Sequence, residues 1–251
     1  MAGLRRTLAT SDHIAAQTVR AARHRLLRIS LPAPGFLVVP LRLVYTAIRS
    51  VSHELVRLCV AEPIFKSYCT QVGRRFRTGA FVHWVNGRGR IIIGDDVLID
   101  GKCSFTFAAR YRDHPTLRIG DRTGIGHACV FVVASEIVIG SDCRIAGGAS
   151  FRDSPGHPLD PEARRRGEPP PADAIKPIVI DDNVWIGSGA IVHGGVHIGT
   201  GSVISSGAVV LSDVSAGSLV AGNPGRRIGV VTPAPVTPAT TTAPDPDPNP
   251  S

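Results

Sequence analysis

A histidine in an unusual segment is the first residue of this chain that could do chemistry. His157 lies in the run Gly156-His157-Pro158-Leu159-Asp160, inside a proline-rich stretch from 152 to 176. Because histidine titrates near neutral pH, its imidazole can take the proton of a hydroxyl group as that oxygen attacks. Asp153 or Asp160 could orient the ring, and either could instead cap the loop. Alternatively, His157 could have only a structural role in a turn with Pro158. The surrounding sequence is needed to choose between the two roles.

The surrounding sequence is a six-residue repeat. In its last uninterrupted block, branched aliphatic residues recur every six positions: Ile180, Ile186, Val192, Ile198, Ile204 and Val210. Each is followed four positions later by a companion that is in most cases small: Val184, Ala190, Val196, Ser202, Ala208 and Val214. Such short periods are typical of parallel β-helices, in which each hexad forms one flat face of a coil.

Three hexads make one coil, so the repeat can be counted along the chain. The coil proper is expected to begin near Arg90, with successive coils starting at Ile93, Ile119, Ile139, Ile180 and Ile198. The largest interruption, residues 152–176, contains His157 and is expected to project from the coil. Long loops on a compact scaffold often carry function.

The cysteines do not form a disulfide pattern. Cys103, Cys129 and Cys143 fall on the small-residue position of the repeat, where a thiol fills space in the core. The chain is therefore interpreted as a reduced, cytoplasmic protein.

The positive charge is concentrated near the N-terminus. The chain has a formal net charge of +8, and residues 1–60 contain nine arginines against two acidic residues. No nucleic-acid motif accompanies these arginines, so an anionic membrane or a partner surface is the favoured contact. The apolar stretch Phe36 to Ile48 is interrupted by Pro40 and Arg42, and it is too short and too charged to span a bilayer. Residues 36–60 could lie on the inner face of a membrane or cap the first coil.

These features predict three parts. Residues 1–62 form a basic helical region, residues 63–230 form the repeat domain with its loop at 152–176, and residues 231–251 form a disordered tail rich in Pro and Thr.

Two further motifs make the pattern specific. After the loop histidine come Asn183-Val184-Trp185-Ile186-Gly187-Ser188 and, at the end of the repeat, Gly222-Asn223-Pro224. This ordered set resembles the left-handed β-helix acyltransferases, in particular the maltose and galactoside O-acetyltransferases and their relatives that modify capsule and envelope polysaccharides. The resemblance covers roughly residues 90–230.

The resemblance implies an all-β solenoid, a left-handed parallel β-helix of hexapeptide repeats, here with an N-terminal helical region. The left-handed sense comes from the resemblance alone, because parallel crossovers are in general right-handed. It also implies a homotrimer that transfers acetyl from acetyl-CoA to a saccharide hydroxyl, with no metal. The acceptor is expected to be a small or lipid-linked saccharide of envelope or extracellular polysaccharide biosynthesis.

Site residues follow from the same resemblance. His157 matches the general base, and Trp185, which lies on an outward position of its hexad, matches an acceptor-pocket residue together with Asp153 and His127. A plain surface or interface role for Trp185 remains open. The residues expected along acetyl-CoA are Gly187, Ser188, Ser206, Gly207, Leu211, Ser212 and Arg226. Ser188 would donate to the developing oxyanion.

The chain departs from the family at two places. Many relatives have Thr-Lys where this chain has Leu211-Ser212, and they place an Asn in the acceptor pocket where this chain has Ala128 beside His127. The acceptor is therefore not expected to be a simple galactoside or maltose.

Three other functions stay open. An N-acyltransferase acting on an amino sugar would use the same fold, and a non-catalytic β-helix scaffold would need no base. A γ-class carbonic anhydrase would bind zinc through His193, His197 and His127, but a catalytic zinc needs three converging ligands and the spacing is wrong.

Overall fold

The computed structural model describes residues 13–28, 30 and 32–231, and these divide into two units, with the boundary between Val51 and Ser52. The predicted helical start before residue 13 and nearly all of the predicted tail lie outside the described residues.

Helices occupy the N-terminal third of the chain. Helix α2 covers Ile14–Leu27, and α3 covers Gly35–Val56 after the Pro32 to Pro34 break. Helix α3 continues through the π-helical turn η1 (Arg57–Ala61) into α4 (Glu62–Tyr68).

Pro40 does not break helix α3. Pro40 is the sixth residue of α3, so its missing N–H removes only one hydrogen bond near the start of the helix. The helical run Gly35–Tyr68 is consequently long and apolar enough, by length and composition, to cross a membrane. This corrects the expectation drawn from the shorter stretch Phe36 to Ile48.

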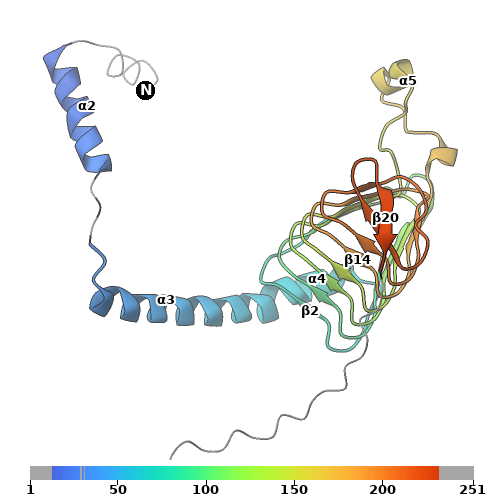
Figure 1. Cartoon of the computed structure of the whole chain (residues 1–251), viewed down its shortest axis with the longest axis horizontal. Coiled ribbons are helices and arrows are strands. Elements are labelled where there is room, and N and C mark those ends of the chain that lie inside the picture. Colours follow the sequence, from blue (N-terminus) through green and yellow to red (C-terminus); the bar gives the residue numbers. More distant parts are fainter. Residues whose placement is uncertain (1–12, 29, 31, 232–251) are drawn as a thin grey trace, which may run out of the picture. The chain divides into compact units, whose positions relative to one another are not determined.

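The remaining chain winds through three parallel sheets in turn, so that up to β18 every third strand joins the same sheet (Figure 1). The first sheet contains β1 (Gln71–Val72), β4 (Arg90–Ile93), β7 (Thr116–Ile119), β10 (Glu136–Ile139), β13 (Ile178–Ile180) and β16 (His197–Ile198). The second contains β2 (Arg77–Thr78), β5 (Leu98–Ile99), β8 (Gly124–Ile125), β11 (Arg144–Ile145), β14 (Trp185–Ile186), β17 (Val203–Ile204), β19 (Ser218–Ala221) and the antiparallel β20 (Arg226–Val230). The third contains β3 (Trp84–Asn86), β6 (Ser104–Phe107), β9 (Val130–Val133), β12 (Ser150–Arg152), β15 (Ile191–His193) and β18 (Val209–Val210).

The predicted coil register is confirmed. The five residues expected to start coils are paired strand to strand in the first sheet: Ile93, Ile119, Ile139, Ile180 and Ile198. The third sheet stacks Phe105, Phe131 and Phe151 inward, with ring centroids 5.2 and 5.1 Å apart. Each inward position therefore packs on its equivalent in the next coil, which excludes water from a continuous core. The predicted filler cysteines are also buried.

The coil begins one turn earlier than the repeat predicted. Strands β1 to β3 form a full coil before Arg90 and pair in parallel with β4 to β6. The repeat did not predict this coil, because the sequence of its hexads deviates from the pattern. Helix α4 covers the open end of this coil with buried Phe65, whose ring lies 5.3 Å from that of Phe105 and 4.7 Å from His83. At the other end, β20 turns back along β19.

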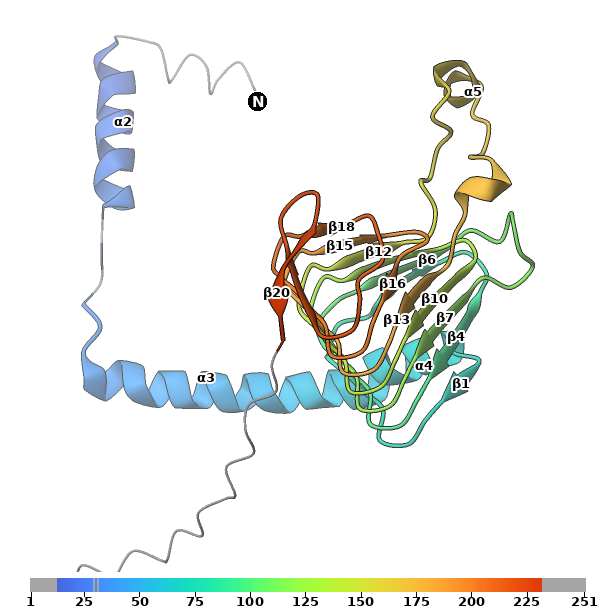
Figure 2. The same cartoon turned by 45° about the vertical axis from the view of Figure 1, so that its right-hand side comes forward.

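Two insertions leave the coil at the corner between the third and first sheets. The shorter connects β6 to β7, and the longer connects β12 to β13 and carries α5 (Pro161–Arg165) and the 3-10 turn η2 (Ala172–Ala174). Figure 2 shows the longer insertion rising from the coil, as the sequence predicted.

Candidate active site

The long insertion is anchored at its base by Asp153. This side chain is fully buried, and its carboxylate accepts hydrogen bonds from the backbone N–H groups of Ala134 (2.7 Å) and Ser135 (2.6 Å) in the preceding coil. Burial raises the pKa of Asp153, while these N–H donors act in the opposite direction. Asp153 thus ties the start of the loop to the coil.

The outer part of the insertion is held by its own contacts. The Asp160 carboxylate caps α5 by accepting from Glu162 N–H (3.3 Å) and Ala163 N–H (2.9 Å). Arg164 donates from Nη1 to the carbonyl of Pro158 at 3.0 Å. The Tyr111 hydroxyl, from the shorter insertion, donates to the carbonyl of Pro170 at 2.8 Å and so joins the two insertions.

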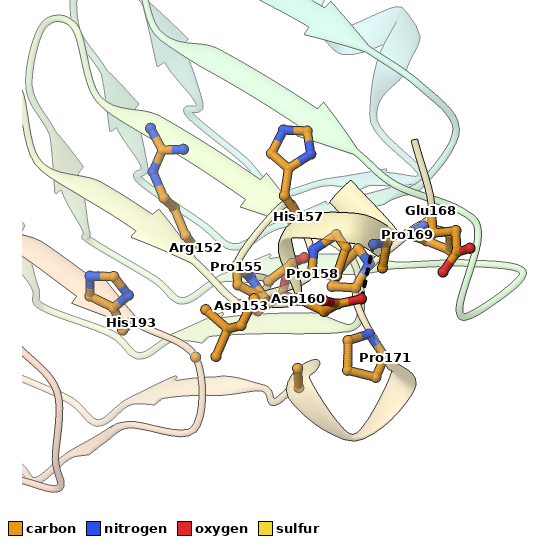
Figure 3. Close-up of a pocket in the computed structure, with 16 residues that line it drawn as sticks. Arg152, Asp153, Pro155, His157, Pro158, Asp160, Glu168, Pro169, Pro171 and His193 are labelled. Atoms are coloured by element: carbon orange, nitrogen blue, oxygen red, sulfur yellow. Dashed lines mark hydrogen bonds between the residues drawn. The ribbon is translucent and has the colours of Figure 1, made fainter. Parts of the chain in front are cut away.

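His157 lies where two cavities meet. The first, of about 900 Å³, is shown in Figure 3 and is lined mainly by residues of the insertion, five of them prolines, with Arg152 and His193 from the third sheet. The second, of about 790 Å³, lies toward the earlier coils and is lined by Arg88, Arg110 and Tyr111 among others. His157 lines both cavities and its side chain is exposed, so one imidazole is accessible from two sides.

Neither predicted orienting acid reaches the imidazole. Within residues 32–231 the hydrogen bonds of Asp153 and Asp160 go to backbone N–H groups and not to His157. In Figure 3 the ring of His157 extends away from Asp160. The loop-capping alternative therefore describes the observed contacts of both carboxylates.

Trp185 and the expected cofactor residues lie elsewhere on the coil. The Trp185 side chain points outward from β14 and is 55% exposed, between Arg144 and Val203 of the neighbouring strands. This confirms its outward position, but it contacts neither of the two cavities that His157 lines.

The corner between the second and third sheets stacks several predicted residues in one column. Gly148 N–H donates to His127 O (2.8 Å), Gly189 N–H to Gly147 O (3.1 Å) and Gly207 N–H to Ser188 O (2.9 Å). Gly187 and Ser206 lie on the same corner, so the structure brings five predicted residues together: His127, Gly187, Ser188, Ser206 and Gly207. A Cβ on Gly207 would meet nothing within 4 Å, which leaves this edge open.

The last predicted cofactor residues gather at the end of the coil. Ser212 and Arg226 line a small cavity of about 150 Å³ together with Asp213 and Arg227, while the side chain of Leu211 is exposed.

Sequence reasoning missed the two third-sheet residues in the wall of the His157 cavity. Arg152 and His193 are paired across β12 and β15, and each follows an inward core residue by one position. The hexad register could have found them, because that position points outward. His193 had been considered only as a zinc ligand.

Among residues 13–28, 30 and 32–231, no group of three or more His, Cys, Asp or Glu side chains is placed to hold a metal ion. His197 instead contacts Asp181 at 2.9 Å.

Comparisons with known proteins agree with this architecture. The family model described as bacterial transferase hexapeptide (six repeats) matches residues 177–212. A Saccharomyces cerevisiae protein named as an acetyltransferase is 35% identical over 136 residues, which are 53% of this chain and 67% of that protein. A Schizosaccharomyces pombe protein named likewise is 38% identical over 112 residues, 45% of this chain and about half (52%) of its own length.

A solved structure shows the same fold. The N-acyltransferase AntD from Bacillus cereus, in complex with dTDP and 3-hydroxybutyryl-CoA, superposes with a TM-score of 0.54 at 18% identity, covering 68% of this chain and 88% of AntD. The chain belongs to the hexapeptide-repeat acetyltransferases, and it is therefore an acyltransferase.

Proposed function

We propose that this protein is an acetyl-CoA-dependent O-acetyltransferase that acts on a hydroxyl of a saccharide, with His157 as the general base. The observation that carries the proposal is the position of His157, which is exposed in both cavities at the base of the long insertion. One ring can thus face an acceptor on one side and a thioester on the other.

The proposed reaction is a single acyl transfer. The acceptor oxygen attacks the thioester carbonyl carbon while His157 takes the hydroxyl proton; the new C–O bond replaces the C–S bond, and the thiolate leaves. The proton held by His157 then passes to the leaving sulfur, so that the products are an ester and the free thiol of coenzyme A. A positioned histidine typically accelerates such a step by about 10²–10⁴-fold.

Acetyl-CoA is proposed to lie along the corner that carries Gly187, Ser188, Ser206 and Gly207. Small side chains and backbone groups that are open at Gly207 allow an extended chain to approach closely. The Ser188 hydroxyl would donate to the thioester oxygen. Leu211, Ser212 and Arg226 continue toward the end of the coil, where Arg226 would meet the nucleotide phosphates.

The complete site is proposed to form in a homotrimer of left-handed coils. In one chain, neither Trp185 nor His127 lines the cavities that contain His157. A closed three-fold ring places different surfaces of neighbouring copies against each other. The loop of one copy would then meet the Trp185 face and the His127 corner of the next, which completes the acceptor pocket.

The acceptor is proposed to be a saccharide of envelope or extracellular polysaccharide biosynthesis, reached from the cytoplasmic side of a membrane. Support comes from α3, in which no residue is buried although most are apolar. Its arginines Arg42 and Arg49 fall seven residues apart, on one face of the helix. Such a helix suits contact with an anionic membrane surface.

The kind of bond formed tests the O-acetyltransferase proposal directly. The protein is incubated with labelled acetyl-CoA and paired acceptors that carry either hydroxyl groups only or one amino group, and the products are located by mass spectrometry. We expect label on the hydroxyl-only acceptors, removable by mild alkali as for an ester. Label found only on amines, and resistant to alkali, would establish N-acylation instead.

A further inference from the structure

We propose that the second cavity binds an anionic group of the acceptor, a carboxylate or a phosphate, through Arg88 and Arg110. The inference rests on the proposed function and narrows its substrate to an acidic saccharide. This cavity lies on the side of His157 that faces the earlier coils, and His157 is the only residue of its lining that the resemblance assigns to the site.

Two arginines line this cavity. Its charged lining residues are Arg88, Arg110 and Glu168, beside the titratable His157. The Glu168 carboxylate already accepts from Nε of Arg166 at 2.6 Å. Among the described residues, no salt bridge joins Arg88 or Arg110 to an acid, so two guanidinium groups carry positive charge that the protein does not neutralise.

Arg88 lies on a turn whose backbone packs closely against the coil. It stands between Gly87, at φ 82°, and Gly89, both of which pack against Phe107. A Cβ on Gly87 would lie 2.0 Å from the Phe107 carbonyl oxygen, and one on Gly89 would lie 2.1 Å from its ring. Only glycines fit this approach, so the turn that presents Arg88 is fixed against the coil.

The backbone at Arg110 is held by different contacts. Its backbone N–H donates to Ala108 O at 2.7 Å, which closes a tight turn. The next residue, Tyr111, donates from its hydroxyl to Pro170 O at 2.8 Å. This bond ties the Arg110 loop to the insertion that carries His157, so the anion site and the base are parts of one connected wall.

Two arginines from separate loops are suited to a planar oxyanion. Guanidinium groups present fixed pairs of N–H donors that match carboxylate and phosphate oxygens, and such charge-assisted bonds are stronger than neutral ones. A neutral sugar would leave both arginines without an ionic partner. The cavity therefore favours an acidic saccharide whose reacting hydroxyl lies beside His157.

The test compares sugar acceptors that carry or lack an anionic group. Acetyl transfer is measured with methyl glucoside, methyl glucuronide and glucose 1-phosphate, so that carboxylate and phosphate form separate arms. For the wild-type protein, we expect kcat/KM to be about tenfold to hundredfold higher for at least one anionic acceptor, with the preference falling as salt is added. The arm with the higher value identifies the anion. Equal values for all three acceptors would overturn the inference.

Variants then assign the preference to the two arginines. Arg88→Ala and Arg110→Ala should each reduce it about tenfold, mainly through KM, with unchanged thermal unfolding. Arg112→Ala is the matched control, because Arg112 is in the same insertion but does not line the cavity. A preference that survives both substitutions would refute this site. Failure of the proposed function would give a different result, namely undiminished acetyl transfer by His157→Ala.

Discussion

The carboxylate of Asp153 accepts the backbone N–H of Ser135 at 2.6 Å, and this bond fastens the insertion that carries His157 to the coil below it. Asp153 therefore anchors the insertion: its buried carboxylate binds backbone N–H groups of the preceding coil. A residue that the sequence offered as an orienting acid acts on the position of the whole loop.

Replacing Asp153 should therefore reduce stability without changing the ionisation of the base. Asp153→Ala leaves the N–H groups of Ala134 and Ser135 buried without an acceptor, which should cost about 2–4 kcal/mol in the free energy of unfolding. Denaturant unfolding measures this loss. The pH dependence of kcat/KM for the folded fraction should stay in place, whereas a shifted limb in Asp153→Asn would indicate a direct interaction with His157.

His83 should make the protein less stable in acid. It is buried between Phe65 and Phe105, and burial lowers its pKa to about 4. The His83 imidazole binds a proton near pH 6.5 in the unfolded chain and only near pH 4 in the folded chain. The free energy of unfolding is therefore unaffected by His83 above pH 6.5 and falls as the pH drops from 6.5 to 4. The full loss, reached below pH 4, amounts to about 3 kcal/mol.

Unfolding of His83→Phe at pH 5 and pH 7 checks this account. In the variant, the free energies of unfolding at pH 5 and pH 7 should differ much less than in the wild type. The variant also loses Nδ1 of His83, which accepts from Cys103 N–H at 3.2 Å, and this loss should lower stability at both pH values. Substitution of the exposed His114 by Gln should leave the difference intact. An unchanged difference in His83→Phe would show that another group is responsible.

Two glycines of the proposed acetyl-CoA edge should respond differently to alanine. A Cβ on Gly187 would lie 2.4 Å from the backbone nitrogen of Ser206, so Gly187→Ala must displace a neighbouring coil and should cost about 3 kcal/mol. Gly207 has φ 70° with nothing within 4 Å, and Gly207→Ala should cost only about 1–2 kcal/mol of backbone strain. Thermal unfolding of the pair gives the comparison; equal losses would contradict the packing described.

Removal of the central core ring should be among the most damaging changes. Phe131 stacks between Phe105 and Phe151 at interplanar angles of 4° and 7°. Phe131→Ala should cost about 3–5 kcal/mol, because adjacent coils cannot close the resulting cavity. Denaturant titration measures the value. A cost under 1 kcal/mol would indicate that the stack is not a rigid core.

A shared site predicts that two inactive variants rescue each other. His157→Ala and Trp185→Ala should each be poorly active alone, while co-expressed chains should regain activity at about a quarter of their interfaces. Sedimentation establishes the trimer in each preparation. Mixed trimers without recovery would place both residues in a site formed by one chain.

The regular part of the fold could be predicted because the aliphatic residue of each hexad marks the position that is buried in the core. Ile93 and Ile198 were assigned to coil starts from spacing alone, and the strands pair them through the intervening coils. The coil before Arg90 could not be predicted, because its hexads do not follow the repeat. That Arg152 and His193 line a cavity could not be predicted from the hexads, because the cavity is formed by the irregular insertion beside them.

The role of His157 as the base is the central claim, and acetyl transfer by His157→Ala tests it most directly. Thiol release from acetyl-CoA in the presence of acceptor is measured for wild type, His157→Ala and the control His114→Ala. We predict a loss of about 10²–10⁴-fold in kcat for His157→Ala, with unchanged acetyl-CoA binding and an unaffected control. Undiminished release by His157→Ala would contradict the account.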